Sequence, residues 1–90
     1  RIILKKNESI TCYFSKHEFP TISYGIIGKD ILRAGDFTVI SSEDSVATVR
    51  KETLGGEFNG FSVSALSTGL SRINVKIGNV YRAFEVLVTK

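Results

Sequence analysis

Apolar and polar residues alternate in short runs along residues 41–77, and each run stops at a glycine or a charged turn. The clearest run covers residues 60–66, where Phe61, Val63 and Ala65 would share one face and Ser62 and Ser64 the other. This alternation is typical of a strand with one buried face. The pattern therefore predicts an antiparallel sheet that buries one of its two faces.

The same alternation predicts strands over most of the chain. We expect them at residues 1–6, 8–14, 36–41, 46–51, 60–66, 70–77 and 80–89. Residues 42–45 form a polar turn in which serine and aspartate side chains bond nearby backbone groups, and residues 54–60 form a glycine-containing loop. Residues 15–35 are the least regular. They favour short strands at residues 21–27 and 30–33, with a helical turn at residues 30–34 as the alternative.

The last two runs are joined by a hairpin signal. Gly78 and Asn79 between two alternating segments are typical of a two-residue loop with a primed turn. If these two residues are the loop, Ile77 lies opposite Val80, and every other pair follows by counting. The sequence thus fixes the register of this hairpin as a prediction.

Two of the counted pairs are informative. Arg72 lies opposite Glu85 on the outer side, a cross-strand pair worth about 0.2–1 kcal/mol. Arg82 lies opposite Val75 on the inner side, which is unfavourable for a charge. Either Arg82 extends to solvent at the end of the sheet, or a bulge shifts the pairing.

Ninety residues form one domain, residues 1–90. Seven or eight short strands predict an all-β fold, an immunoglobulin-like β-sandwich of about seven antiparallel strands. The chain has no methionine and no signal-peptide pattern, so we expect a segment of a larger protein. The predicted core consists of the inward apolar residues Ile3, Ile10, Cys12, Phe14, Phe37, Val39, Ala47, Val49, Phe61, Val63, Ala65, Ile73, Val75, Phe84, Val86 and Val88.

Composition narrows the possible functions. The single cysteine, Cys12, follows Ile10 and precedes Phe14 at a period of two, so we expect it in the core as a small apolar residue. The net charge is +3, and the twelve basic residues are scattered among nine acidic ones. Nucleic-acid binding would favour a concentrated basic stripe with aromatic residues between the charges. We therefore expect no nucleic-acid partner and no direct membrane insertion.

Four segments together resemble the bacterial immunoglobulin-like domains of the group-2 type. They are the strand and turn ILKKNESI at residues 3–10, the SSEDSVATV run at residues 41–49, GLSRINV at residues 69–75, and VLV at residues 86–88. Asn7 stands where the family usually has glycine, the usual tryptophan before the Ser-Ser pair is absent, and residues 15–35 do not match. The resemblance implies a β-sandwich in a cell-surface or secreted bacterial protein, often joined to other modules, and no catalytic residues.

The residues offer little catalytic or metal chemistry. His17 is the only histidine, and its neighbours Ser15 and Glu18 are too close in sequence to assemble a triad with it. Zinc would need several cysteine or histidine ligands. Glu43 and Asp44, with the serines around them, form the one oxygen cluster that calcium could use, and a polar turn explains it better. We predict no catalytic residue, no metal and no cofactor.

Aromatic side chains provide the remaining candidates for binding. Tyr13 is expected on the outer face of its strand, and Phe19 and Tyr24 lie in the irregular segment beside His17. Aromatic faces with polar groups nearby suit sugar rings or a protein partner, although core packing and strand propensity also account for these residues. The candidate binding residues are Tyr13, His17, Phe19 and Tyr24.

These observations predict a non-enzymatic structural or adhesive module of a bacterial surface or secreted protein. It would act as a spacer or assembly unit whose partners are neighbouring domains of the same chain. The alternative is a glycan- or protein-binding module that uses loops at one end of the sandwich, chiefly residues 16–24. The expected location is the cell surface, either anchored to the outer membrane or secreted.

Overall fold

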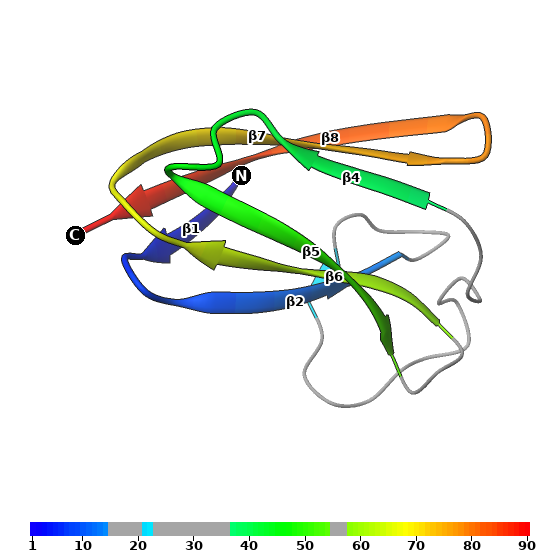
Figure 1. Cartoon of the computed structure of the whole chain (residues 1–90), viewed down its shortest axis with the longest axis horizontal. Coiled ribbons are helices and arrows are strands. Elements are labelled where there is room, and N and C mark those ends of the chain that lie inside the picture. Colours follow the sequence, from blue (N-terminus) through cyan, green and yellow to red (C-terminus); the bar gives the residue numbers. More distant parts are fainter. Residues whose placement is uncertain (15–20, 23–36, 55–57) are drawn as a thin grey trace.

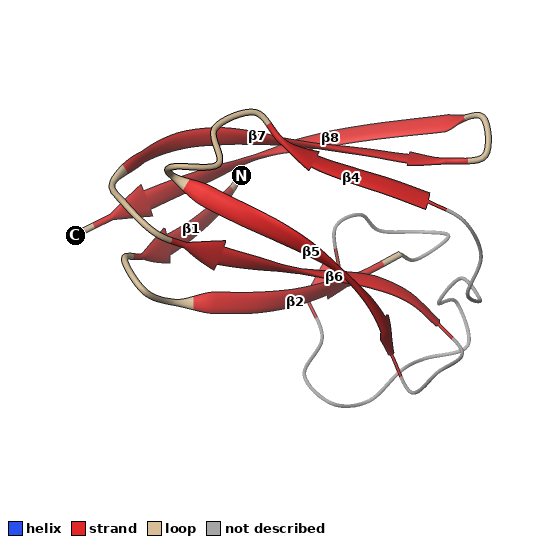
Figure 2. Cartoon of the chain, in the orientation of Figure 1, coloured by secondary structure: helices blue, strands red, loops and turns tan. Residues whose placement is uncertain are grey.

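The computed structural model of the chain describes residues 1–14, 21–22, 37–54 and 58–90. All regular structure in these ranges is strand, and no helix there could cross a membrane (Figure 2). The strands are β1 (Ile2–Lys5), β2 (Ser9–Tyr13), β3 (Thr21–Ile22), β4 (Phe37–Ser41), β5 (Ala47–Leu54), β6 (Phe58–Ala65), β7 (Gly69–Ile77) and β8 (Val80–Thr89).

The strands form two four-stranded sheets that pack face to face (Figure 1). One sheet has the order β1-β8-β7-β4 and the other β3-β2-β6-β5. The predicted β-sandwich is confirmed. One pair departs from the expected antiparallel arrangement, because β1 runs parallel to β8. The turn after β1 carries the chain into the opposite sheet, so β1 and β2 do not form a hairpin.

The β7–β8 hairpin has the predicted register. Ile77 lies opposite Val80, and the ladder continues without interruption to Gly69 opposite Val88. Gly78 has a φ of 57°, in the left-handed region that this type of loop needs and that glycine adopts without steric cost. The two-residue loop read from the sequence therefore sets the pairing of the longest two strands.

The structure also settles the position of Arg82. It lies opposite Val75 with no bulge, and its exposed guanidinium donates a hydrogen bond to the Tyr81 carbonyl at 2.9 Å. Arg72 lies opposite Glu85 as counted, but the Glu85 carboxylate pairs with Arg1 at 3.3 Å. The first of the two readings of Arg82 is correct.

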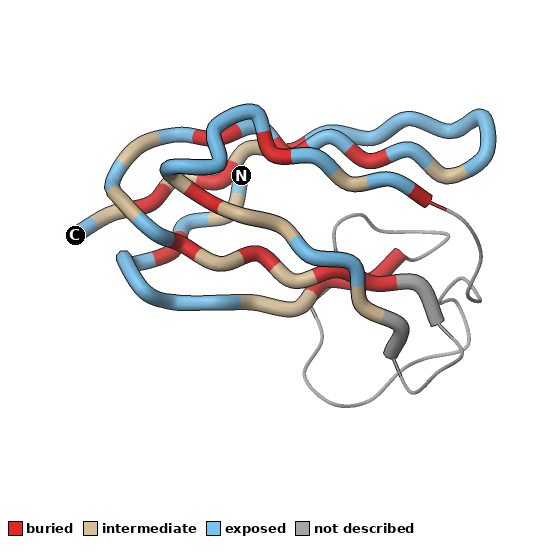
Figure 3. Tube along the Cα trace, viewed as in Figure 1, coloured by how far each residue is buried: buried red, intermediate tan, exposed pale blue. Residues whose placement is uncertain are grey.

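The core lies between the sheets and contains most of the predicted residues. Four phenylalanines cross it in a row: Phe14 meets Phe37 edge-on at 5.0 Å between ring centroids and Phe61 at 5.6 Å, and Phe61 stacks on Phe84 at 5.9 Å. Phe37 and Phe84 come from one sheet and Phe61 from the other. Buried and exposed residues alternate along the strands around this row (Figure 3).

Two sequence predictions in this region were wrong. Ile3 is 65% exposed, and Leu4, at 4%, takes its place in the core. Parallel pairing with β8 sets this phase, because Leu4 lies beside the buried Val88 and Ile3 beside the half-buried Leu87. The loop expected at residues 54–60 is shorter, since β5 continues to Leu54 and β6 begins at Phe58. Of the irregular segment, Thr21–Ile22 is a strand, and the other strands or the helical turn expected there lie outside the described residues.

Asn7 marks the turn between the sheets. Its φ is 75°, and the Glu8 amide donates to the Lys5 carbonyl at 3.0 Å across it. Only Asn7 has a positive φ among the described non-glycine residues, so this is a type II turn with Lys6 at its first central position. Asparagine tolerates this backbone better than most residues, which suits it to this position.

Candidate functional site

The first predicted binding residue, Tyr13, is buried in the structure. Tyr13 is 7% exposed, and its strand lies between β3 and β6, opposite Thr21 and Gly60. It is therefore a packed side chain and not a surface platform. His17, Phe19 and Tyr24 lie outside the described residues. The structure does not bring the four candidates together within its described part.

The polar turn at residues 42–45 is present, and hydrogen bonds tie it to residues far along the chain. Ser42 Oγ accepts the Arg72 amide at 2.9 Å, Ser71 Oγ accepts the Glu43 amide at 3.2 Å, and Ser67 Oγ donates to the Ser45 carbonyl at 2.6 Å. The expectation of a local bond was wrong for the Ser42 hydroxyl, which bonds the backbone of β7. Within residues 1–14, 37–54 and 58–90, no three acidic, histidine or cysteine side chains gather where a metal could sit.

Two buried hydroxyls fasten the same end of the sandwich. Ser41 Oγ donates to the Ala47 carbonyl at 2.6 Å and lies 2.6 Å from Ser71 Oγ. Since a serine has one hydroxyl proton, Ser71 must donate to Ser41. Ser41 and Ala47 belong to different sheets, so this bond joins the two layers. These polar groups serve the fold.

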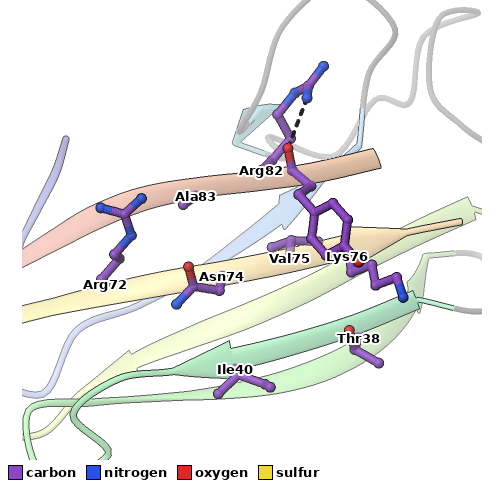
Figure 4. Close-up of a pocket in the computed structure, with 9 residues that line it drawn as sticks. Thr38, Ile40, Arg72, Asn74, Val75, Lys76, Arg82 and Ala83 are labelled. Carbon is purple, nitrogen blue, oxygen red and sulfur yellow. Dashed lines mark hydrogen bonds between the residues drawn. The ribbon is translucent and has the colours of Figure 1, made fainter. Parts of the chain in front are cut away.

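A shallow groove on the outer face of the β1-β8-β7-β4 sheet is the best candidate site. It has a volume of about 590 Å³ and crosses β4, β7 and β8 (Figure 4). Its lining residues are Thr38, Ile40, Arg72, Asn74, Val75, Lys76, Tyr81, Arg82 and Ala83. Arg72, Asn74 and Lys76 reach this face together because they occupy every second position of β7. The hairpin register then places Tyr81 opposite Lys76.

The groove is cationic. Its lining contains three basic residues and no acidic one, and two of the basic residues, Arg72 and Lys76, stand at outward positions of β7. The Lys76 ammonium lies 5.3 Å from the centroid of the Tyr81 ring, a cation–π geometry, and Tyr81 is 67% exposed. The nearest acidic residue in the ladder, Glu85, forms an ion pair with Arg1. In the described part of the chain, Arg72 and Lys76 thus have no carboxylate partner.

A second hollow of about 340 Å³ adjoins the first. It is lined by Phe37, Thr38, Lys51, Lys76 and Gly78, and it shares Thr38 and Lys76 with the groove. Lys51 places its ammonium 4.9 Å from the centroid of the Phe37 ring. The two hollows therefore form one surface that extends the positive charge from β7 toward β5.

Among the titratable groups of the described residues, Cys12 is the one whose pKa departs clearly from its ordinary value. Its side chain is fully buried in the core, and loss of hydration raises the pKa of the thiol from 9.0 to about 12. The group therefore stays a protonated thiol in neutral solution. Such a cysteine is an inert core residue, as the sequence predicted.

Sequence reasoning missed the groove because it treated the basic residues as a scattered, solvated surface. A usable signal was present. The outward positions of the run at residues 70–77 include Arg72, Asn74 and Lys76, and the predicted hairpin register already placed Tyr81 beside Lys76. What the sequence could not supply was β4, which brings Thr38 and Ile40 to the same face.

The chain is similar in structure to domains of the S-layer protein SbsC. The chain matches domains 4 and 5 of the S-layer protein SbsC with a TM-score of 0.70 and 21% identity, over 99% of this chain and 41% of that one. It matches domains 5-6 of SbsC with a TM-score of 0.68 and 21% identity, over 98% and 39%. For domains 4-9 of SbsC the TM-score is 0.68, with 21% identity over 98% of this chain and 12% of that one.

At this identity the similarity shows the fold. The chain spans about 40% of the first two structures that it matches, and those structures contain more than one domain. No protein family and no curated protein matches the sequence.

Proposed function

We propose that the chain is a non-enzymatic structural module of a bacterial surface or secreted protein, and that it carries mechanical load between neighbouring domains of the same chain. Three findings support this proposal: the β-sandwich, its similarity to S-layer domains, and the packing of most apolar side chains of the described residues into one core. The resemblance to group-2 bacterial immunoglobulin-like domains belongs to the same proposal. So do a cell-surface or secreted location and an adhesive role.

The observation that best supports a mechanical role is the parallel pairing of β1 with β8. These are the first and last strands of the chain, and they pair from Ile2 opposite Val86 to Lys5 opposite Thr89. The Lys6 amide extends the ladder with a bond to the Thr89 carbonyl at 2.8 Å. Opposite pulling forces at Arg1 and Lys90 would therefore slide two parallel strands along each other.

This geometry resists force because all the hydrogen bonds between the two strands are loaded at the same time. When adjacent parallel strands are pulled from opposite ends, the hydrogen bonds between them lie across the direction of force and must break together. Peeling a hairpin would break them one at a time. Each such bond contributes only about 0.5–1.5 kcal/mol, so resistance depends on simultaneous loading.

Force spectroscopy on a tandem array of this domain tests the proposal. Pulling through the two termini should give regular unfolding peaks, and Lys6→Pro should lower the peak force. Lys6 occupies a turn position where φ is about −60°, which suits proline. The substitution therefore removes the bond to Thr89 and retains the turn.

Lys5→Pro is the matched control. The Lys5 amide donates to Glu8 Oε1 at 2.6 Å and not to β8, so the peak force should stay close to that of the unmodified chain. Thermal unfolding of both variants checks that their equilibrium stabilities are similar. An array that extends without peaks, or that responds equally to both prolines, would contradict the load-bearing role.

The alternative of glycan or protein binding through loops at residues 16–24 stays a prediction, because those residues include His17, Phe19 and Tyr24 and lie mostly outside the described ranges. A binding role has support elsewhere on the molecule, at the cationic groove.

A further inference from the structure

The cationic groove has the chemistry of a ligand site. Its charged residues all have the same sign, and in the described part of the chain Arg72 and Lys76 meet no carboxylate. We propose that this groove binds an acidic polysaccharide through the carboxylates of its sugar units. The groove uses residues 81–83 of β8, whereas β1 pairs with residues 86–89 of that strand, so the inference does not depend on the mechanical role of the β1–β8 pair.

The spacing of the cations favours a chain of repeated charges. Arg72 and Lys76 are four residues apart on one strand, which corresponds to about 13 Å at roughly 3.3 Å per residue. One carboxylate cannot contact both cations at that distance. An oligosaccharide with an acid group on successive units can reach both, and the adjoining hollow continues the positive surface to Lys51.

The remaining lining residues suit sugar. Tyr81 presents an exposed aromatic ring beside the Lys76 ammonium, and aromatic faces pack against the apolar face of a sugar ring. Asn74 and Thr38 are exposed on the same face, and their amide and hydroxyl groups can bond sugar hydroxyls. The groove thus combines the groups that hold a carbohydrate with the charges that select an acidic one.

Two other polyanions fit the groove less well. An extended peptide would bind by adding a strand to a sheet edge, which on this side is β4, whereas Arg72 and Lys76 stand on β7, which is already paired with β4 and β8. Its backbone therefore offers no free ladder of donors and acceptors. A single-stranded nucleic acid would favour several aromatic platforms, and Tyr81 is the only aromatic residue in the lining.

Titration of the 15N-labelled chain with penta-galacturonic acid tests the inference. Amide shifts should concentrate at Thr38, Arg72, Asn74, Lys76 and Tyr81, and the affinity should fall as salt rises from about 20 to about 150 mM, because exposed charges are then screened. The fully methyl-esterified pentamer, which has the same rings without charge, should bind roughly tenfold more weakly or not at all.

Substitutions separate the groove from general charge. Arg72→Gln and Lys76→Gln should each weaken binding of the acid roughly tenfold. Arg50→Gln and Lys5→Gln remove the same charges at exposed positions outside the groove, and should leave the affinity within about twofold. Amide spectra of the free variants check that all four retain the fold.

Tyr81→Ala separates sugar from peptide. It should weaken the binding of the galacturonic acid pentamer severalfold and leave the binding of penta-glutamate unchanged. Equal effects of the groove and control substitutions would overturn the site. Tighter binding of the glutamate peptide, with no effect of Tyr81→Ala on the sugar, would replace the polysaccharide by an acidic protein segment. Shifts confined to other residues would also refute the inference.

Discussion

The two halves of the β7–β8 hairpin have the same backbone and opposite surroundings. In the half formed by residues 69–75 and 84–89, here the packed half, every second residue lies against the other sheet and is buried, as at Ile73 and Val86. In the distal half, residues 76–83, the equivalent inner positions include Val80, which is 49% exposed, and Arg82. Figure 3 shows this change along one continuous pair of strands.

The comparison shows that strand pairing and core packing are separable. The ladder is uninterrupted from Gly69 to Ile77, so backbone pairing does not weaken where burial ends. What changes is how far the inner side chains are buried. The inner side chains of the packed half stabilise the fold, whereas Val80 and Arg82, at inner positions of the distal half, are exposed.

Replacing a valine by alanine in each half should give the largest difference in stability between the two halves. Val86→Ala removes two methyl groups from a fully buried position, and should cost about 2–3 kcal/mol of unfolding free energy through lost burial and a residual cavity. Val80→Ala, on the same strand and the same side, should cost less than about 0.5 kcal/mol. Urea unfolding at a common slope measures both.

Similar losses for the two valines would contradict the comparison. A large effect at Val80 would mean that the distal half supports the core. A small effect at Val86 would mean that the interior re-packs to fill the space.

The packed half is also the part that the sequence predicted well. Alternation in residues 70–77 and the Gly78–Asn79 loop were enough to set the register and the inward residues, because a slip by one residue would turn the whole apolar set outward. Ile3 failed for the converse reason. Ile2, Ile3 and Leu4 are all apolar, so that segment has no alternation, and its phase depends on pairing with a strand more than eighty residues away.

The groove was predictable only in part. The outward positions of residues 70–77 and the hairpin register placed Arg72, Lys76 and Tyr81 on one face, but Thr38 and Ile40 join them only because β4 pairs with β7. Tyr13 shows the same limit in reverse. Alternation with Cys12 predicted an outward, exposed side chain, yet Tyr13 is buried.

The glycines that bound β7 offer a second, smaller contrast. Gly69 has a φ of 146°, and an added Cβ would lie 2.9 Å from Val46 Cγ2. Gly78 has a φ of 57° with open space around it. Gly69→Ala should therefore cost about 1–3 kcal/mol, from backbone strain and a clash, and Gly78→Ala about 1 kcal/mol, from the backbone alone.

Thermal unfolding measures this difference, since about 1 kcal/mol shifts the midpoint by roughly 4–8 °C in a domain of this size. The Gly69 variant should regain part of its loss when Val46 is also changed to alanine, whereas the Gly78 variant should not respond to that change. Equal losses without such coupling would show that crowding at the packed end adds nothing to the strain.

The smallest effect on stability at neutral pH is expected from the ionisation of the buried Cys12 thiol. Burial raises the pKa of Cys12 to about 12 from 9.0, so the folded state holds its proton more tightly than the unfolded chain does. The stability that this provides is complete below about pH 9, and is lost as pH rises from about 9 toward 12. Cys12→Ala should remove that part of the alkaline slope and leave the contribution of other groups.

A cysteine placed in the distal half provides the matched case. Ala83 is exposed on the outer face of β8, so Ala83→Cys in a Cys12→Ala background should react with a thiol reagent near pH 8 at least a hundredfold faster than native Cys12, which is both protonated and inaccessible. If native Cys12 reacted as fast, its end of the core would have to open readily, and the contrast between a packed and a solvent-facing part of the sheet would apply only to the average structure.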